Sequence, residues 1–140
     1  MDVEIKENRL RYGNVLDEET ERIARELVDA IFAVHSYLGP GLIESVYVEC
    51  LLIELELRGI KAQREVQVPI VYRGRTAKTR LRIDLLVEGR IIVEAKAIEN
   101  KNDLFKLKTR TYLRLAGLRL GFLVNFNVAL IKDGITRIIL

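Results

Sequence analysis

The sequence is poor in several residue types that carry chemistry: it has one cysteine, one histidine, two prolines and no tryptophan. A lone cysteine excludes an internal disulfide, and Cys50 lies among apolar residues at helical spacing, so we expect a buried, reduced thiol. Because His35 is the only histidine, a catalytic cysteine has no support. His35 itself is expected to be structural, since it lies just before a Gly39-Pro40-Gly41 turn.

Long apolar runs are absent as well. No run approaches the roughly 18 residues that a membrane span needs, and the charged opening Met1-Asp2-Val3-Glu4 is unlike a signal peptide. We therefore expect a cytoplasmic protein with no membrane partner. A chain of 140 residues with 49% hydrophobic content can bury one sizeable core. The predicted organisation is a flexible N-terminal arm over residues 1–16 and one domain over residues 17–140.

The charge is distributed unevenly along the chain. Residues 1–56 contain 13 acids and 5 bases, a net −8, whereas residues 57–140 contain 7 acids and 18 bases, a net +11. Two basic clusters account for most of this excess, and a polyanion is the natural partner for such a field. Solvated surfaces are the alternative for each cluster alone. We predict nucleic-acid contacts, with DNA as the first candidate, for Arg73, Arg75, Lys78, Arg80, Lys106, Lys108 and Arg110.

Hydrophobic periodicity predicts an α/β sandwich around a mixed sheet. The expected order is helix, helix, three antiparallel strands, helix, strand, strand. Asp17 can cap the first helix, and Gly59 suits the left-handed turn that ends the second. The expected elements after these helices are strands from Ile60, over about 79–87 and over about 90–97, a helix over about 103–116, and strands over 120–126 and 135–139. A proline in the first strand, Pro69, indicates an edge strand or the end of a strand.

Two carboxylates and a lysine interrupt the apolar second and third strands: Asp84, then Glu94 and Lys96. Buried charge is costly without a function, and a pair of acids that binds a divalent cation is such a function. A two-residue loop at Glu88-Gly89 would point the acids to opposite faces. A three-residue loop over residues 87–89 pairs Asp84 with Ile92 and makes Asp84 and Glu94 diagonal neighbours, roughly 7 Å apart. We predict the second register, because it also creates a wholly apolar opposite face.

Glu44 lies on the apolar stripe of the second helix, one turn before Tyr47, so its carboxylate is expected to point inward near the helix start. Tyr47 is expected to pack and to donate a hydrogen bond rather than to act as a nucleophile. Glu65 could approach the acids from its strand, although a solvent-facing role is preferred. A structural ion-pair cluster that includes Arg82 is the alternative to a metal site at Asp84, Glu94 and Lys96.

Taken in order, these residues resemble the GxxExxY family, a branch of the PD-(D/E)XK nuclease superfamily. The naming motif is the segment Gly41-Leu42-Ile43-Glu44-Ser45-Val46-Tyr47, and Glu94-Ala95-Lys96 supplies the Glu-x-Lys element. The likeness extends to the segments 82–87, 112–115 and 125–127, and to His35. It implies a restriction-endonuclease-like core in which Glu44, Asp84, Glu94 and the Ala95 carbonyl bind Mg²⁺ or Mn²⁺. In that arrangement Lys96 would position the attacking water of a nuclease.

Two positions depart from the family pattern. Lys108 replaces a glutamine in the helix after the Glu-x-Lys strand, and Phe105 stands where a polar residue, often histidine, is expected. Cleavage could therefore survive, change or be lost while nucleic-acid binding is retained. Two alternatives stay open: an inactive nucleic-acid-binding or assembly module in which Lys108 neutralises the acids, and a regulatory protein that recognises an acidic protein surface. An unpaired edge strand could also support a homodimer.

Overall fold

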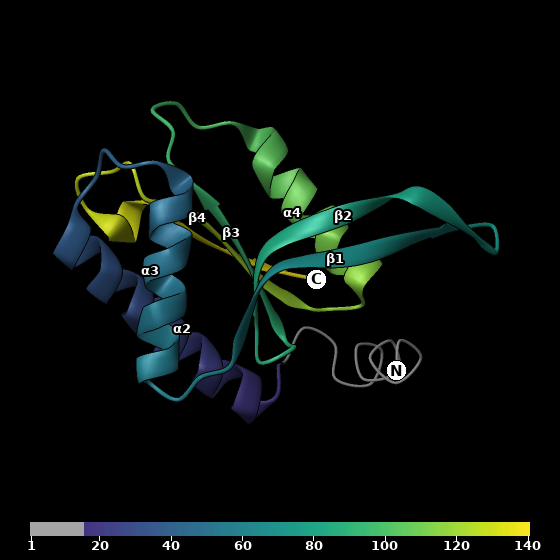
Figure 1. The fold of residues 1–140 in the computed structure, drawn as a ribbon, viewed down its shortest axis with the longest axis horizontal. Coiled ribbons are helices and arrows are strands. Elements are labelled where there is room, and N and C mark those ends of the chain that lie inside the picture. Colours follow the sequence, from purple (N-terminus) through teal and green to yellow (C-terminus); the bar gives the residue numbers. More distant parts are fainter. Residues whose placement is uncertain (1–15) are drawn as a thin grey trace.

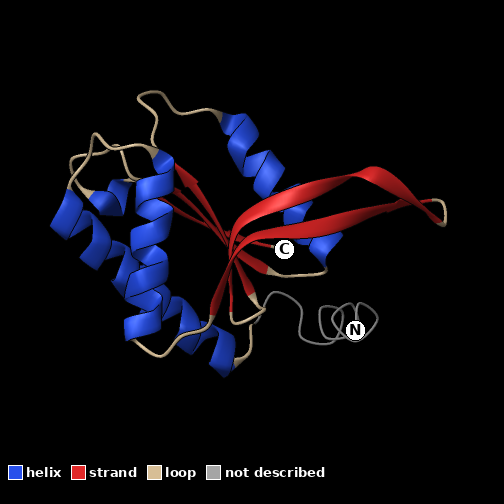
Figure 2. Cartoon of the chain, viewed as in Figure 1, coloured by secondary structure: helices blue, strands red, loops and turns tan. Residues whose placement is uncertain are grey.

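The computed structural model describes residues 16–140, and it has the predicted order of helices and strands (Figures 1 and 2). The predicted N-terminal arm lies, apart from Leu16, outside the described residues. The elements are α2 (Glu18–Leu38), α3 (Glu44–Leu57), β1 (Ala62–Tyr72), β2 (Arg75–Val87), β3 (Ile91–Lys96), α4 (Asp103–Ala116), β4 (Leu120–Asn125), a short 3₁₀ helix η1 (Ile131–Asp133) and β5 (Ile135–Ile139). Within residues 16–140 no helix is both long enough and apolar enough to cross a membrane.

Local signals explain where the helices begin and end. The Asp17 carboxylate accepts the backbone N–H of Thr20 at 2.8 Å and so caps α2. Asn102 caps α4 in the same way, and Gly117 ends that helix in the left-handed conformation with φ 70°. Gly59 also adopts a positive φ after α3, as predicted. Sequence signals of this kind depend on neighbouring residues only, which is why they predict the helix ends well.

The five strands form one mixed sheet in the order β1-β2-β3-β4-β5. Strands β3 and β4 are parallel, and all other neighbours are antiparallel. Helices α2 and α3 cover one face and bury the larger apolar core, which includes Leu27, Leu51 and Val93. Helix α4 connects β3 to β4 across the other face, where Leu113 packs on Ile92 in a smaller core. Because β1 lies at the end of the sheet, the prediction of an edge strand from Pro69 is confirmed.

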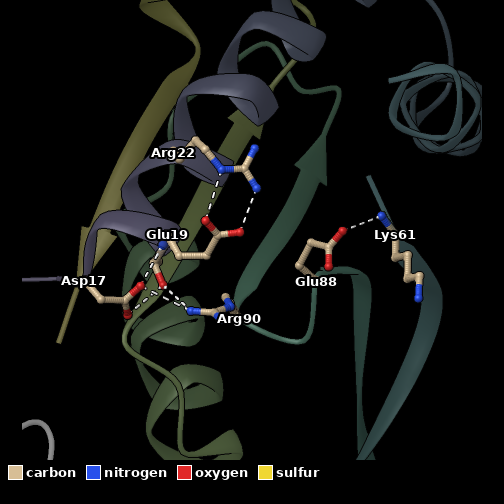
Figure 3. A network of polar contacts seen from close by, with 7 residues as sticks. Asp17, Glu19, Arg22, Lys61, Glu88 and Arg90 are labelled. Atoms are coloured by element: carbon tan, nitrogen blue, oxygen red, sulfur yellow. Dashed lines mark hydrogen bonds and ion pairs between the residues drawn. The ribbon is translucent and has the colours of Figure 1, made fainter. Parts of the chain in front are cut away.

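The loop between β2 and β3 has three residues, as predicted, but it lies one position further along the chain. Val87 pairs with Ile91, so the loop is Glu88-Gly89-Arg90, and the predicted pairing of Asp84 with Ile92 is wrong, because Ile92 pairs with Leu86. Side chains and backbone outside the hairpin explain the shift (Figure 3). Glu88 exchanges two hydrogen bonds with the backbone of Lys61, and the Arg90 guanidinium donates to Asp17 Oδ1 at 3.2 Å. Arg90 therefore leaves the strand to reach the start of α2.

The alternation of side chains along β2 breaks at Asp84. Leu86 and Ile83 both pack in the core under α4, although three positions separate them, while Leu85 packs in the core under α2 and α3. Opposite Asp84, the β1–β2 ladder skips Glu65, which has a positive φ of 55°. The register is the same on both sides of this break, and the register shift of the hairpin lies further out, between Pro69 and Val71. Beyond Glu65 the hairpin leaves the body of the molecule as a two-stranded ribbon (Figure 1).

Three smaller predictions are corrected. Strand β2 begins at Arg75 rather than near Thr79, because the hairpin continues its ladder out to the Tyr72–Arg75 pair. Cys50 is half-buried rather than buried, since it packs at the margin of the larger core. The strand predicted over residues 120–126 ends at Asn125, and the 3₁₀ helix η1 lies between it and β5.

Candidate active site

Asp84 and Glu94 meet where strands β2 and β3 separate. The ladder between the strands ends at the Leu85–Val93 pair, and the two acids are the next residues. The backbone N–H of Asp84 donates to Glu94 Oε1 at 3.4 Å, and the backbone N–H of Ala95 donates to Asp84 Oδ2 at 2.9 Å. Each carboxylate thus accepts a hydrogen bond from the opposite strand. The two acids lie directly across from each other rather than diagonally as predicted, and they share one gap in the sheet.

The environment of this pair disfavours two negative charges. Glu94 is only 4% exposed, and Asp84 is half-buried. Burial, followed by repulsion from Asp84, raises the pKa of Glu94 to about 7. The hydrogen bond from the Asp84 backbone and the positive charges of Lys108 and Lys96 act in the opposite direction but do not cancel this rise. A cation placed in the gap would remove the repulsion and favour the ionised pair.

Lys96 lies on the side of the sheet that α4 covers, two residues after Glu94. Its ammonium sits 4.4 Å from the ring centroid of Phe105, near the start of α4. Among the described residues no carboxylate lies within 4 Å of this ammonium, so Lys96 does not form the structural ion pair that was the alternative. Phe105, a departure from the family pattern, thus becomes the residue that positions Lys96.

Lys108 stands one turn further along α4. It is exposed, its ammonium lies 5.4 Å from the ring centroid of Tyr112, and its charge lowers the pKa of Glu94. No ion pair within 4 Å joins Lys108 to a described acid. The Lys108 ammonium therefore acts on the Asp84–Glu94 pair by electrostatics at longer range and does not occupy the gap between the two carboxylates. Lys106 and Arg110 on the same helix are also exposed.

Glu44 does not join the other acids. It begins α3, on the helix layer of the opposite face, and it is exposed rather than directed inward. Within residues 16–140 no set of three Asp, Glu, His or Cys side chains lies close enough to hold a metal ion. The helical stripe predicted the inward direction of Tyr47 correctly, but residues in the first turn lie beyond the apolar core and need not follow it.

Tyr47 and His35 have structural roles, as expected. The Tyr47 hydroxyl donates to the Gly39 carbonyl at 2.6 Å and accepts the backbone N–H of Leu42, which fixes the turn between α2 and α3. Its ring stacks on Phe126 with a centroid distance of 4.5 Å. The buried His35 contacts the Val128 carbonyl through Nε2 at 2.9 Å. Glu65 is exposed and lies 3.9 Å from Arg82, which agrees with the preferred solvent-facing role.

Asn125 is a residue of the site region for which sequence reasoning found no role. Its side-chain amide donates to the Ile98 carbonyl at 3.0 Å, and its Oδ1 accepts the backbone N–H groups of Ile98 and Asn127. These bonds hold the chain that leaves β3 just after Lys96. A polar residue at the end of a buried strand is the signal that could have revealed it, because such a residue needs backbone partners.

The chain belongs to the PD-(D/E)XK nuclease superfamily. A family model of that superfamily matches residues 21–138, which include both carboxylates and Lys96. The three helices and mixed five-stranded sheet of the described residues are consistent with the restriction-endonuclease-like fold, so the predicted fold class is confirmed. Comparisons with curated proteins and with solved structures give no match.

Proposed function

We propose that the chain is a Mg²⁺-dependent nuclease that hydrolyses phosphodiester bonds of DNA or RNA, with Mn²⁺ as a substitute ion. The observation that carries the proposal is the buried Asp84–Glu94 pair, which shares one gap in the sheet and has Lys96 on the same side. Membership of the nuclease superfamily supports it. The GxxExxY branch is proposed on the segment 41–47, which contains Glu44 and Tyr47 in the motif order.

The oxygen donors of the pair suit a hard divalent cation. Both residues are carboxylates, the ligands that Mg²⁺ and Mn²⁺ prefer, and the pKa of Glu94 is raised by burial and by repulsion from Asp84, which a bound cation would offset. Asp84, Glu94 and the Ala95 carbonyl would hold the ion, while Glu44, exposed at the start of α3, lies apart from them. When bound, the cation would supply positive charge to phosphate oxygens that become more negative in the transition state.

Lys96 is proposed to orient the attacking water. An ammonium has three N–H donors and no acceptor, so it can hold a water oxygen while leaving a lone pair free to attack phosphorus. The Phe105 ring supports this function, because it keeps the ammonium close to the acids without neutralising it. The basic side chains of α4, including Lys106 and Arg110, are proposed to hold the phosphate backbone next to the site.

The test is cleavage of a supercoiled plasmid and of a labelled RNA by the purified chain with Mg²⁺ or Mn²⁺. We expect cleavage of at least one substrate, and a loss on the order of 1,000-fold in Lys96→Met and in Asp84→Asn. Lys61→Met and Glu18→Gln are the matched controls, because both residues are exposed and lie near the start of β3, whereas Lys96 is its last residue. We expect the controls to cleave like the unmodified chain.

The non-cleaving nucleic-acid-binding module is the other function this experiment addresses. An unmodified chain that binds nucleic acid at low salt but leaves both substrates intact with either ion would favour that module. Cleavage that persists in both site variants would exclude the proposed active site, because the activity would then come from elsewhere in the chain or from a contaminant.

A further inference from the structure

The part of the β1–β2 hairpin beyond Glu65 and Asp84, residues 66–83, projects from the molecule as a two-stranded ribbon, which we call the basic ribbon (Figure 2). All ten residues from Val71 to Arg80 are exposed. A hairpin this exposed contributes little to the core, so the stability of the domain does not explain its length. Only the root is packed, where the buried Ile83 belongs to the core under α4 and Val66 and Val68 pack against that core.

The basic ribbon has a strongly one-sided charge. It contains five cations and no acidic residue. Arg82 is the only one of the five with an ion pair to a described acid, and that pair with Glu65 spans 3.9 Å between two exposed side chains. The other four, Arg73, Arg75, Lys78 and Arg80, form no ion pair within residues 16–140. Four unpaired cations along one narrow projection form a site for a polyanion.

The shape of the ribbon indicates which polyanion it fits best. The major groove of B-form DNA, about 12 Å wide, admits a two-stranded β-ribbon, whereas the major groove of duplex RNA is too narrow for side chains to enter. The nine residue steps from Asp84 to Arg75 span about 30 Å at the rise of a β-strand. This length is close to one helical turn of DNA, about 34 Å. A DNA duplex bound along the ribbon would therefore extend from the tip of the ribbon to the acid pair at the root of the ribbon.

Single strands fit the ribbon less well. Proteins that bind single-stranded nucleic acid usually combine cations with several aromatic side chains on which bases stack. Tyr72, which is 70% exposed, is the one aromatic residue in the ribbon. The cations lie in the turn and on β2, where no further aromatic side chain alternates with them.

We propose that the basic ribbon binds in the major groove of duplex DNA and makes duplex DNA the substrate of the nuclease. This inference rests on the proposed function for the cleavage step, but the binding can be measured without cleavage. The ladder irregularity at Glu65 and Asp84 connects the two functions: the position where the ribbon leaves the sheet is also the position where the acid pair opens.

The experiment measures equilibrium binding of the Asp84→Asn full chain, without divalent ions, to a duplex DNA of about 24 base pairs, a little over two helical turns. A single strand and an RNA duplex of the same sequence are the competitors. The test variant adds Arg75→Ala, Lys78→Ala and Arg80→Ala. Its matched control adds Arg25→Ala, Lys61→Ala and Lys132→Ala, which remove the same charge from exposed positions outside the ribbon. Unchanged melting temperatures will show that both variants fold.

We expect the parent to bind duplex DNA at least about tenfold more tightly than either competitor, as groove geometry implies. The ribbon variant should bind duplex DNA on the order of 100-fold more weakly at 0.1 M salt, and the salt dependence of its affinity should have a slope shallower by about three. The control should lose much less affinity. The ribbon variant should also lose the preference for duplex DNA. Preference for a single strand or RNA, or an equal loss for all three nucleic acids, would overturn the proposal.

Two further outcomes are distinguished by the same set of proteins. If the ribbon variant binds like the parent but changes from dimer to monomer in sedimentation, the ribbon is a contact between copies of the chain and the proposal is wrong. If duplex binding behaves as expected while the unmodified chain cleaves nothing with Mg²⁺ or Mn²⁺, the nuclease function fails and the ribbon's role in DNA binding stands.

Discussion

The two ends of strand β2 differ in burial, in charge and in what holds them. Leu85 and Val87, at the end that pairs with β3, are fully buried, and Asp84 lies at the edge of that region. Residues 75–80, at the other end, are all exposed and have β1 as their neighbouring strand. A cation at the exposed end has no desolvation cost, whereas a carboxylate at the buried end does. A charge therefore indicates function more strongly near β3 than in the ribbon.

Removing one apolar side chain from each end of β2 should affect stability very differently. Leu85→Ala should lower the free energy of unfolding by about 2–5 kcal/mol, because it leaves a cavity in the larger core. Val71→Ala, in the ribbon at 61% exposure, should change it by less than about 0.5 kcal/mol. Urea denaturation of both variants checks this. Equal losses would mean that the ribbon is packed against something in solution.

At the buried end of β2, the acid pair should make the stability of the domain depend on pH. The pKa of Glu94 is raised to about 7 from an ordinary 4.5, so the folded, metal-free protein favours the protonated carboxyl. This contribution is fully present below about pH 4.5 and is lost as the pH rises through about 7, a loss of about 3 kcal/mol. Unfolding of the metal-free chain between pH 5 and 8, roughly the range of that titration, should show the fall.

The matched variant for this prediction is Glu94→Gln, which keeps the shape of the side chain but cannot ionise. Its stability should stay nearly level over the same pH range, and above pH 7 it should exceed that of the unmodified chain. Glu99→Gln, an exposed neighbour, should leave the pH profile unchanged. An unmodified chain whose stability rises with pH would contradict the assignment of a repulsive, buried acid pair.

A glycine at the ribbon tip tests the exposed end. Gly74 has φ 79°, and a Cβ added to it would meet no atom within 4 Å. Gly74→Ala should therefore lower the free energy of unfolding by about 1 kcal/mol, because of backbone strain alone and without any steric clash. Calorimetry measures this, with Ala77→Gly as a control in the same ribbon. A much larger loss would indicate that the tip makes contacts within the fold.

The smallest effect is expected from Lys108→Gln, which restores the glutamine of the family pattern. Since the Lys108 charge lowers the pKa of Glu94, its removal should raise that pKa further. Carbon-13 NMR of the Glu94 carboxyl measures the change directly, and Lys101→Gln on the preceding loop is the control. A pKa that does not move would mean that the Lys108 ammonium stays away from the acid pair in solution.

Much of the fold could be predicted because its signals are local. The cap at Asp17, the left-handed Gly59 and the period-two pattern of the strands depend on short segments, and they predicted the element order correctly. The hairpin register depends on more distant partners. Glu88 binds Lys61 and Arg90 reaches Asp17, and neither contact is visible from the hairpin sequence.

The candidate site also has some features that local sequence predicts and others that depend on distant contacts. The proximity of Asp84 and Glu94 could be predicted, because a three-residue loop leaves the two acids as neighbours across the strands in the predicted register and in the observed one, although the register itself is one position off. The exposure of Glu44 could not, since the direction of a first-turn side chain depends on where the core ends rather than on helical spacing. The support of Lys96 by Phe105 depends on how α4 crosses the sheet, which no short segment determines.

The central claim, that Asp84 and Glu94 form one cation site, is tested most directly by calorimetric titration of Mn²⁺ into the chain at pH 7 in two buffers with different ionisation enthalpies. We predict that the ion binds with release of a fraction of a proton, because Glu94 with a pKa of about 7 is partly protonated before binding. The Asp84→Asn, Glu94→Gln double variant should lose both the binding and the proton release. Binding of the same strength and proton count in that double variant would contradict the account.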